Sequence, residues 1–308
     1  MTPNIPTLNP QINNSMSSEF NLSELISLEG IGTLNHFPNL ILIVLVLFLM
    51  WIGKKVFDLL TSYSIEHQLV KEDNKAITVS FVGYLGGVAL ILEGVLETGS
   101  DSLLVELMNI TIWGIIGILL LNLAGKVNDR IILHRFNNVD ELLNQQNVSV
   151  GVAMAGGYLG SAVIIRSIII GESLGWAYDI GLTLFYFVLA QLAFYLSAFL
   201  HQLVTRYDFH QEIHNKNVAA GISFGSSLVA VGILLSIPLR ESYSLVFFAA
   251  WFVLGSAVMA FFRFVMDRII IPQEKLDEEI HKDQNWGIAL LEGCFAIAAV
   301  MTLQSVFI

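Results

Sequence analysis

The sequence predicts an all-α polytopic membrane helical bundle of eight transmembrane helices, made from four tandem two-helix repeats. The first observation is composition: 55% of the 308 residues are hydrophobic and 13% are charged, whereas soluble domains carry about 25% charged residues. The second is that the apolar residues are concentrated in runs of about 20, the length that crosses a hydrocarbon core. The third is an internal repeat with a period of about 70 residues.

The apolar runs define the spans and the organisation of the chain. They lie near 40–60, 76–96, 104–126, 148–170, 177–201, 218–237, 245–267 and 286–307. Residues 1–38 form a polar tail without Lys or Arg, which we expect to be uncleaved because a signal peptide needs a basic start. Repeats 1 and 2 then occupy 39–171, and repeats 3 and 4 occupy 172–308.

The basic residues indicate the orientation of the chain. Thirteen of the fifteen Lys and Arg residues lie in or beside the loops that follow the first, third, fifth and seventh spans. The positive-inside rule therefore places these loops in the cytoplasm, and the N-terminal tail and the C-terminus on the extracytoplasmic side. The net charge of −11 argues against a nucleic-acid partner, and the lipid bilayer is the partner that composition does predict.

An asparagine stands where each repeat enters its second span. These anchors are Asn74, Asn147, Asn217 and Asn285, with spacings of 73, 70 and 68. Asn is a preferred N-cap, because its side-chain oxygen accepts from a backbone N–H that the helix leaves unpaired. We expect helix capping at these positions, with direct contact to a ligand as the alternative.

The second span of each repeat is rich in small residues four positions apart, which lie on one helix face. They are Gly83, Gly87, Gly156, Gly160, Gly221, Gly225 and Gly293, the last paired with Ala289. In lipid, small residues let helix backbones approach closely. We therefore expect the even-numbered spans at the centre and the bulkier odd-numbered spans toward lipid, with the repeats related by rotation about the membrane normal.

Polar residues at membrane depth are the candidate functional groups, because they are costly in lipid. Glu93 and Arg166 both lie 19 residues after their anchors, and Ser236 and Gln304 occupy the equivalent positions. They form either a polar layer that lines a pathway between the even-numbered helices, or an ion pair that fixes helix register. Glu292 stands alone in its span, as a proton relay or cation ligand, as a protonated acid, or as a group facing water.

No catalytic constellation is present, and we expect neither enzyme activity, nor a metal site, nor a cofactor. His210 and His214 are four residues apart, but Gln211 follows the first of them where a zinc protease has Glu. The sequence has no phosphate-binding glycine loop and no dinucleotide fingerprint.

The second repeat resembles a known family. The residues that carry the resemblance are Glu141, Leu142, Asn147, Gly156, Gly157 and Gly160, echoed by Leu69, Asn74, Gly83, Gly86 and Gly87. They are similar to the YjfL-type bacterial inner-membrane family, catalogued as domain of unknown function 350. The likeness covers about 40–308, and the third and fourth copies depart from it. Typical members have half as many spans, so this chain resembles two of them fused, which implies that shorter relatives dimerise.

The resemblance implies a multi-pass protein of the bacterial inner (plasma) membrane, with no established activity to transfer. Its members are often associated with phage-shock-type membrane-stress proteins. Our first hypothesis is a channel or transporter for a small or cationic solute, because charges at membrane depth exceed what a scaffold needs. The alternative is a non-catalytic scaffold that recruits a cytoplasmic partner in envelope stress or membrane maintenance. A homo-oligomer is the other protein assembly that we consider.

Overall fold

The computed structural model describes residues 40–99, 102–170 and 175–307. The polar tail at 1–38 lies outside the described residues. The chain divides into two compact units, Met1–Ile41 and Leu42–Ile308. The described part of the first unit is Leu40 and Ile41, at the start of a helix. The second unit contains the four repeats.

The described residues contain eight helices long and apolar enough to cross a membrane. They are α2 (Leu40–Leu60), α4 (Lys75–Glu97), α5 (Leu103–Val127), α7 (Val148–Ile170), α8 (Trp176–Val204), α10 (Val218–Glu241), α11 (Leu245–Val265) and α13 (Trp286–Phe307). Helices satisfy every backbone group internally, which a chain in lipid requires. The predicted all-α bundle of eight spans is confirmed.

Short elements join the two spans of each repeat. The connecting helices are α3 (Ile65–Val70), α6 (Asn138–Leu143), α9 (Phe209–His214) and α12 (Leu276–His281). Two spans run past their predicted ends at 126 and 267, because α5 and α11 continue as the π-helical turns η4 (Asn128–Ile132) and η5 (Met266–Ile270). Both turns end in Asp-Arg-Ile-Ile, so the extension is itself part of the repeat.

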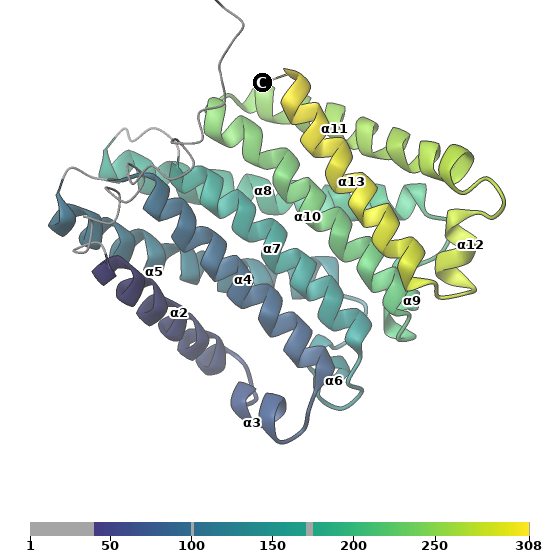
Figure 1. The fold of residues 1–308 in the computed structure, drawn as a ribbon, viewed down its shortest axis with the longest axis horizontal. Helices are drawn as coiled ribbons and strands as arrows, with labels where there is room; N and C mark the ends of the chain where they lie inside the picture. The colour runs from purple at the N-terminus through teal and green to yellow at the C-terminus, as the bar shows by residue number, and fades with distance from the viewer. Residues whose placement is uncertain (1–39, 100–101, 171–174, 308) are drawn as a thin grey trace, which may run out of the picture. The chain divides into compact units, whose positions relative to one another are not determined.

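Within the second unit, the even-numbered spans form an inner layer. Figure 1 shows α4, α7, α10 and α13 side by side in chain order, with α5, α8 and α11 behind them. Each of these three outer helices packs against two neighbouring inner helices. The inner helices α7 and α10 are 72% and 67% buried, against 17–28% for α2, α5 and α11. The small-residue spans α4, α7 and α10 are thus the most buried, as predicted, whereas α13 at the end of the row is 33% buried against 44% for the outer helix α8.

The inner helices form a row, which corrects the prediction that the repeats surround a central axis. The physical reason lies in where the small residues fall around each helix. On α7, Gly151 and Ala155 contact α4, whereas Gly156 and Gly160 contact α10. At about 100° per residue, these two faces lie about 140° apart. A closed ring of four helices needs about 90°, so the sequence encodes a nearly straight row instead.

The predicted packing glycines all lie at contacts between helices. A methyl group on Gly156 would collide with the backbone of Gly225, and one on Gly160 with the Leu228 carbonyl. The remaining five repeat the same relationship. Gly83 faces the Ala155 backbone, Gly87 faces Ala162, Gly221 faces Ser149, Gly225 faces Val152 and Gly293 faces Ser226. Close backbone approach therefore holds the inner layer together.

The tyrosine of the first inner helix joins both layers. Tyr84 Oη donates to the Gly53 carbonyl on α2 at 3.0 Å and accepts from Asn122 Nδ2 on α5 at 2.8 Å. Tyr84 is fully buried, so these hydrogen bonds satisfy a polar group that lipid could not. They fix α2 and α5 against α4.

Candidate functional site

Glu93 and Arg166 form an ion pair between α4 and α7. Arg166 Nε lies 2.6 Å from Glu93 Oε2 and Nη2 lies 3.1 Å from Oε1. Arg166 Nη2 also contacts Glu97 Oε1 at 2.8 Å. The two carboxylates are a turn apart on α4, and together they hold the guanidinium in a two-point geometry that a single charge pair lacks. The sequence interpretation missed Glu97, because it counted this residue with the outer loop.

The ion pair lies on the face of the inner layer that the outer helices leave uncovered. Arg166 shares a half-buried stripe with Val152, Leu159 and Val163 on α7. The carboxylate of Glu93 is 53% exposed. In the equivalent places, Ser236 Oγ donates to the Ile233 carbonyl of its own helix at 2.7 Å, and Gln304 is half-buried on α13. The four equivalent residues thus form a row across this face, and they do not surround a common axis.

Glu292 is not the isolated carboxylate that its position in the sequence suggested. Ser223 Oγ donates to its Oε2 at 2.6 Å, and Arg263 on α11 forms an ion pair with its Oε1. Arg263 Nη2 also bonds Asp277 Oδ1 at 2.7 Å. This arginine was not predicted as a partner, because it lies close to the basic residues of the following loop in the sequence. The two spans of the fourth repeat are therefore joined by a buried charge pair.

This charge pair lies in the wall of a cavity of about 360 Å³ between α8, α10, α11 and α13. Most of the lining is apolar, including Leu200, Val231 and Phe295. Two buried polar atoms of the lining, His201 Nε2 and Ser256 Oγ, have no hydrogen-bond partner among the described residues. The site is a mainly apolar space whose wall includes the Arg263–Glu292 pair and the polar side chains of His201 and Ser256.

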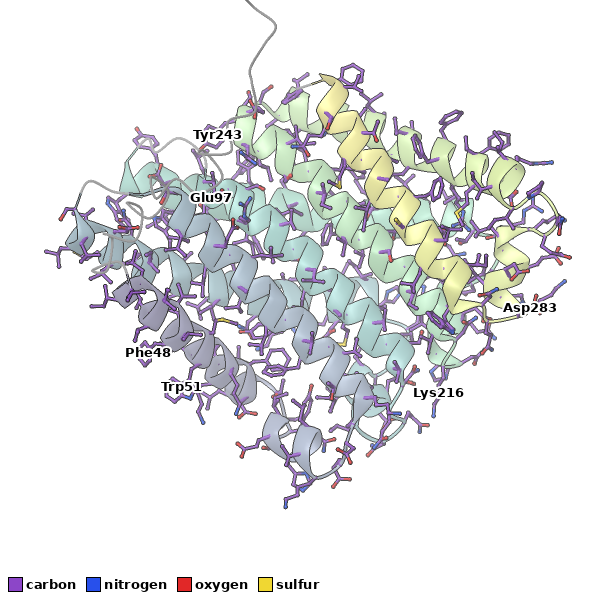
Figure 2. The ribbon with its side chains drawn as sticks, in the orientation of Figure 1. Phe48, Trp51, Glu97, Lys216, Tyr243 and Asp283 are labelled. Atoms are coloured by element: carbon purple, nitrogen blue, oxygen red, sulfur yellow. The ribbon has the colours of Figure 1, made fainter. Side chains whose placement is uncertain are left out.

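The anchor asparagines gather at one end of the inner layer, here called the anchor end, together with α3, α6, α9 and α12. Figure 2 shows Lys216 and Asp283 at this end, and Glu97 and Tyr243 at the opposite end. Each anchor caps its own helix. Asn74 Oδ1, for example, accepts from Ile77 N–H at 3.1 Å, and Asn217 Oδ1 accepts from Ala220 N–H at 3.3 Å.

Each of the first three anchors also bonds the next repeat. Asn74 Nδ2 donates to the Leu142 carbonyl, Asn147 Nδ2 to the Ile213 carbonyl and Asn217 Nδ2 to the Ile280 carbonyl, at 2.8, 2.8 and 2.7 Å. These three anchors are fully buried. The side-chain amide of each of these anchors therefore caps the N-terminus of a helix through its oxygen and joins two repeats through its nitrogen.

Two buried glutamates add a second connection between repeats. Glu141 holds Asn147 Nδ2 at 2.7 Å and lies 2.7 Å from His214 Nδ1 of the next repeat. Glu212 holds Asn217 Nδ2 at 2.8 Å and lies 3.0 Å from His281 Nδ1. The two histidines of α9 therefore have different partners. His214 contacts Glu141, whereas His210 Nε2 lies 2.7 Å from the Ile132 carbonyl. Burial lowers the pKa of His210.

The outer spans are tied to the anchor end as well. Asp58 Oδ1 accepts from Ile65 N–H at 2.8 Å, and Asp267 Oδ1 accepts from Leu276 N–H at 2.9 Å. Gln202, at the equivalent position of the third repeat, accepts from Phe209 N–H at 3.2 Å. Each bond fixes the start of a connecting helix to the end of the span before it. These hydrogen bonds therefore give α3, α9 and α12 defined positions on the bundle.

Comparison with known proteins agrees with this repeat architecture. The model of the family described as Domain of Unknown Function (DUF350) matches residues 30–169 and again residues 174–307. The chain belongs to this family. A DUF350 model thus matches it twice, which confirms the double-length organisation that the repeat predicted. A UPF0719 transmembrane protein of Aquifex aeolicus (strain VF5) is 24% identical over 265 residues, which are 83% of this chain and 96% of the relative. No solved structure matches the chain.

Proposed function

We propose that this DUF350 protein is a non-catalytic scaffold of the bacterial plasma membrane, which presents its anchor end to a cytoplasmic partner in envelope stress or membrane maintenance. The observation that carries the proposal is the chain of hydrogen bonds from Asn74, Asn147 and Asn217 to the next repeat. It turns four separate loops into one continuous platform. Such pre-organisation lowers the entropic cost of binding a partner.

The charge distribution supports a cytoplasmic location for this platform. The loops of the anchor end and their flanks hold thirteen of the fifteen basic residues, and short loops rich in Lys and Arg stay in the cytoplasm. Both termini are then extracytoplasmic. The orientation can be tested with a Cys294→Ser chain that carries Lys216→Cys, because a maleimide that cannot cross the membrane should label it only after the cytoplasmic side is opened.

Photo-crosslinking in living cells tests the scaffold directly. A photoreactive phenylalanine derivative at Lys216 should give a discrete adduct with another protein, because this exposed residue belongs to the platform. The same derivative at Arg240 is the matched control, since Arg240 is also exposed and basic but lies at the other end of α10. Adducts at both positions, or at neither, would contradict the proposal.

Transport of a small or cationic solute is the second candidate, and the cavity beside Arg263 and Glu292 favours it. The tight backbone contacts of the inner layer and the two-point Glu93–Arg166 pair argue for the scaffold, because a pathway between these helices needs space and free charges. Ion flux into liposomes that contain the purified protein separates the two. Flux that Glu93→Gln and Arg166→Gln abolish would replace the scaffold with a channel, and no flux above empty liposomes is the expected result.

A further inference from the structure

The contact surface that joins one inner helix to the next is repeated on the last inner helix, where no described residue packs against it. α7 meets α10 through Gly156 and Gly160, nine and thirteen residues after their anchor. The same positions on α13 are Cys294 and Ala298, which are both exposed. The leading edge of the array is defined here by its small exposed residues Gly287, Cys294, Ala298 and Ser305, and the larger Leu290 lies beside them. A side chain on Gly287 would meet no neighbouring repeat among the described residues.

The first inner helix carries the complementary surface. α10 receives α7 on Gly221, Gly225, Leu228 and Gly232. The residues at the same distances from the anchor on α4 are Thr78, Val82, Leu85 and Ala89, here called the trailing edge. All four are exposed or half-buried, and Val82 is 62% exposed. Each internal contact has a glycine on at least one side at this point, whereas Val82 and Cys294 both carry a side chain, so the two helices would be farther apart here than α7 and α10 are.

Hydrogen bonding is incomplete at the same two ends. Asn285 caps α13 and bonds Glu279 at 2.8 Å, but it reaches no carbonyl of a following repeat among the described residues. The Leu69 carbonyl aligns with those of Leu142, Ile213 and Ile280, and no anchor in the described part of the chain donates to it. One end of the array therefore offers an amide donor, and the other offers the acceptor that this donor uses in each internal contact.

Among the described residues, the outer helix α2 at the first end has an inner helix on one side only. α5 lies in the groove between α4 and α7, and by the same repeat relation α2 would lie between α4 and a preceding inner helix. Phe48 and Trp51 of α2 stack with ring centroids 5.8 Å apart, and both are 53% exposed. Figure 2 shows them on the side of α2 that faces away from α4. An aromatic pair in this place can pack against a preceding inner helix.

We propose that a second copy of this chain docks head to tail, with the leading edge on its α13 against the trailing edge on α4 of the next copy, and with Asn285 donating to the Leu69 carbonyl. The contact continues three interfaces already present inside the chain. It joins two different surfaces, so each added copy exposes a new end, and the assembly grows until a ring closes or a filament forms. In lipid, the small residues and the polar bond supply the attraction.

Cysteine crosslinking in native membranes tests this contact, because Cys294 is the only cysteine of the chain and lies on the leading edge. Two differently tagged full-length chains are expressed together. One is the natural chain, with its thiol at position 294, and the other carries Val82→Cys with Cys294→Ser. Oxidation with copper phenanthroline should give the mixed dimer and neither homodimer. A chain with Val82→Cys and its natural Cys294 should give a ladder of dimers, trimers and larger species.

A matched control and a second variant keep the test independent of folding. Val188→Cys with Cys294→Ser is the control, since Val188 on α8 is 67% exposed but lies away from both edges, and it should give no mixed dimer. Ala298→Phe should abolish the crosslink while the midpoint of thermal unfolding in dilute detergent stays unchanged, because Ala298 is exposed in a single copy. Absence of the mixed dimer, homodimers instead of it, or equal crosslinking at position 188 would overturn the proposal.

Discussion

Asn217 Nδ2 donates to the Ile280 carbonyl at 2.7 Å, across 63 residues of sequence, while its Oδ1 caps α10. The same relationship joins Asn74 to Leu142 and Asn147 to Ile213. It explains why asparagine suits this position better than another capping residue. Asp and Ser can accept from the helix N–H groups, but neither side chain supplies the amide donor that reaches the next repeat.

Replacement of the third anchor should be more harmful than replacement of the fourth. Asn217→Ala removes a cap and a buried bond between repeats, and it leaves Glu212 without one of its donors. We expect a loss of about 2–4 kcal/mol in the free energy of unfolding. Asn285→Ala removes a half-buried cap without a bond to a following repeat, and should cost about 1 kcal/mol.

Chemical unfolding of both variants in dilute detergent, where single copies are measured, checks this difference. The two substitutions are chemically identical, so they alter the unfolded chain to the same extent. Equal losses would mean that capping alone accounts for the anchors and that the bonds between repeats contribute nothing.

The sequence was sufficient for the spans and for the repeat, because both depend on regular patterns of single residues. Apolar runs of the length of α4 or α10 have few alternatives to a membrane helix. The arrangement of the repeats was predicted incorrectly, although the necessary information was present. Gly151 and Gly156 belong to different faces of α7, and angles computed between such faces would have indicated a row.

The candidate site could be predicted only where both partners belong to the repeat. Glu93 and Arg166 share an offset from their anchors, so they were identified together. Arg263 aligns with Lys54 of the first repeat, but Glu292 has no acidic counterpart in the other repeats. Its pairing with Arg263 across α11 and α13 was therefore not predicted. Contacts between residues that do not repeat require the packed structure.

Arg263 and Glu292 should behave as a coupled buried pair. Arg263→Met leaves the Glu292 carboxylate without its positive partner near the cavity, whereas Glu292→Met leaves the guanidinium paired with Asp277 alone. Arg263→Met should lose about 3–5 kcal/mol of unfolding free energy and Glu292→Met less, and the double variant should lose less than the sum of the two. A double-mutant cycle measured by chemical unfolding gives the coupling energy, and additive losses would show that the two side chains act independently.

Gly156 should tolerate no side chain, because the added atom would meet the backbone of Gly225. Gly156→Ala would force α7 and α10 apart and should cost about 1–3 kcal/mol or more. Gly181→Ala is the matched control, since Gly181 lies within α8 and has no neighbouring atom at the place of the new methyl. This control should be neutral or more stable by up to about 1 kcal/mol, because alanine favours a helix. Comparable destabilisation of both variants would refute close packing at Gly156.

The pH dependence of stability should contain a contribution from His210. Burial is the largest cause of its lowered pKa, and the positive charge of Arg135 acts in the same direction. Because the folded-state pKa lies below the unfolded value of about 6.5, the unfolded chain binds more protons as the pH falls through this range. The stabilisation from neutral His210 is therefore complete above about pH 6.5, and it is lost as the pH falls toward the folded-state pKa.

The comparison of natural and His210→Gln chains isolates this contribution. Gln keeps a donor for the Ile132 carbonyl but does not titrate, so its unfolding free energy should fall less between pH 7.5 and pH 5 than that of the natural chain. All other ionisable groups are present in both chains, so their contributions cancel in the difference. A difference between the two chains that stays constant with pH would exclude His210 as a source of acid sensitivity. A natural chain that gains stability relative to the variant at low pH would reverse the sign of the argument, because it would require a folded-state pKa above the unfolded one.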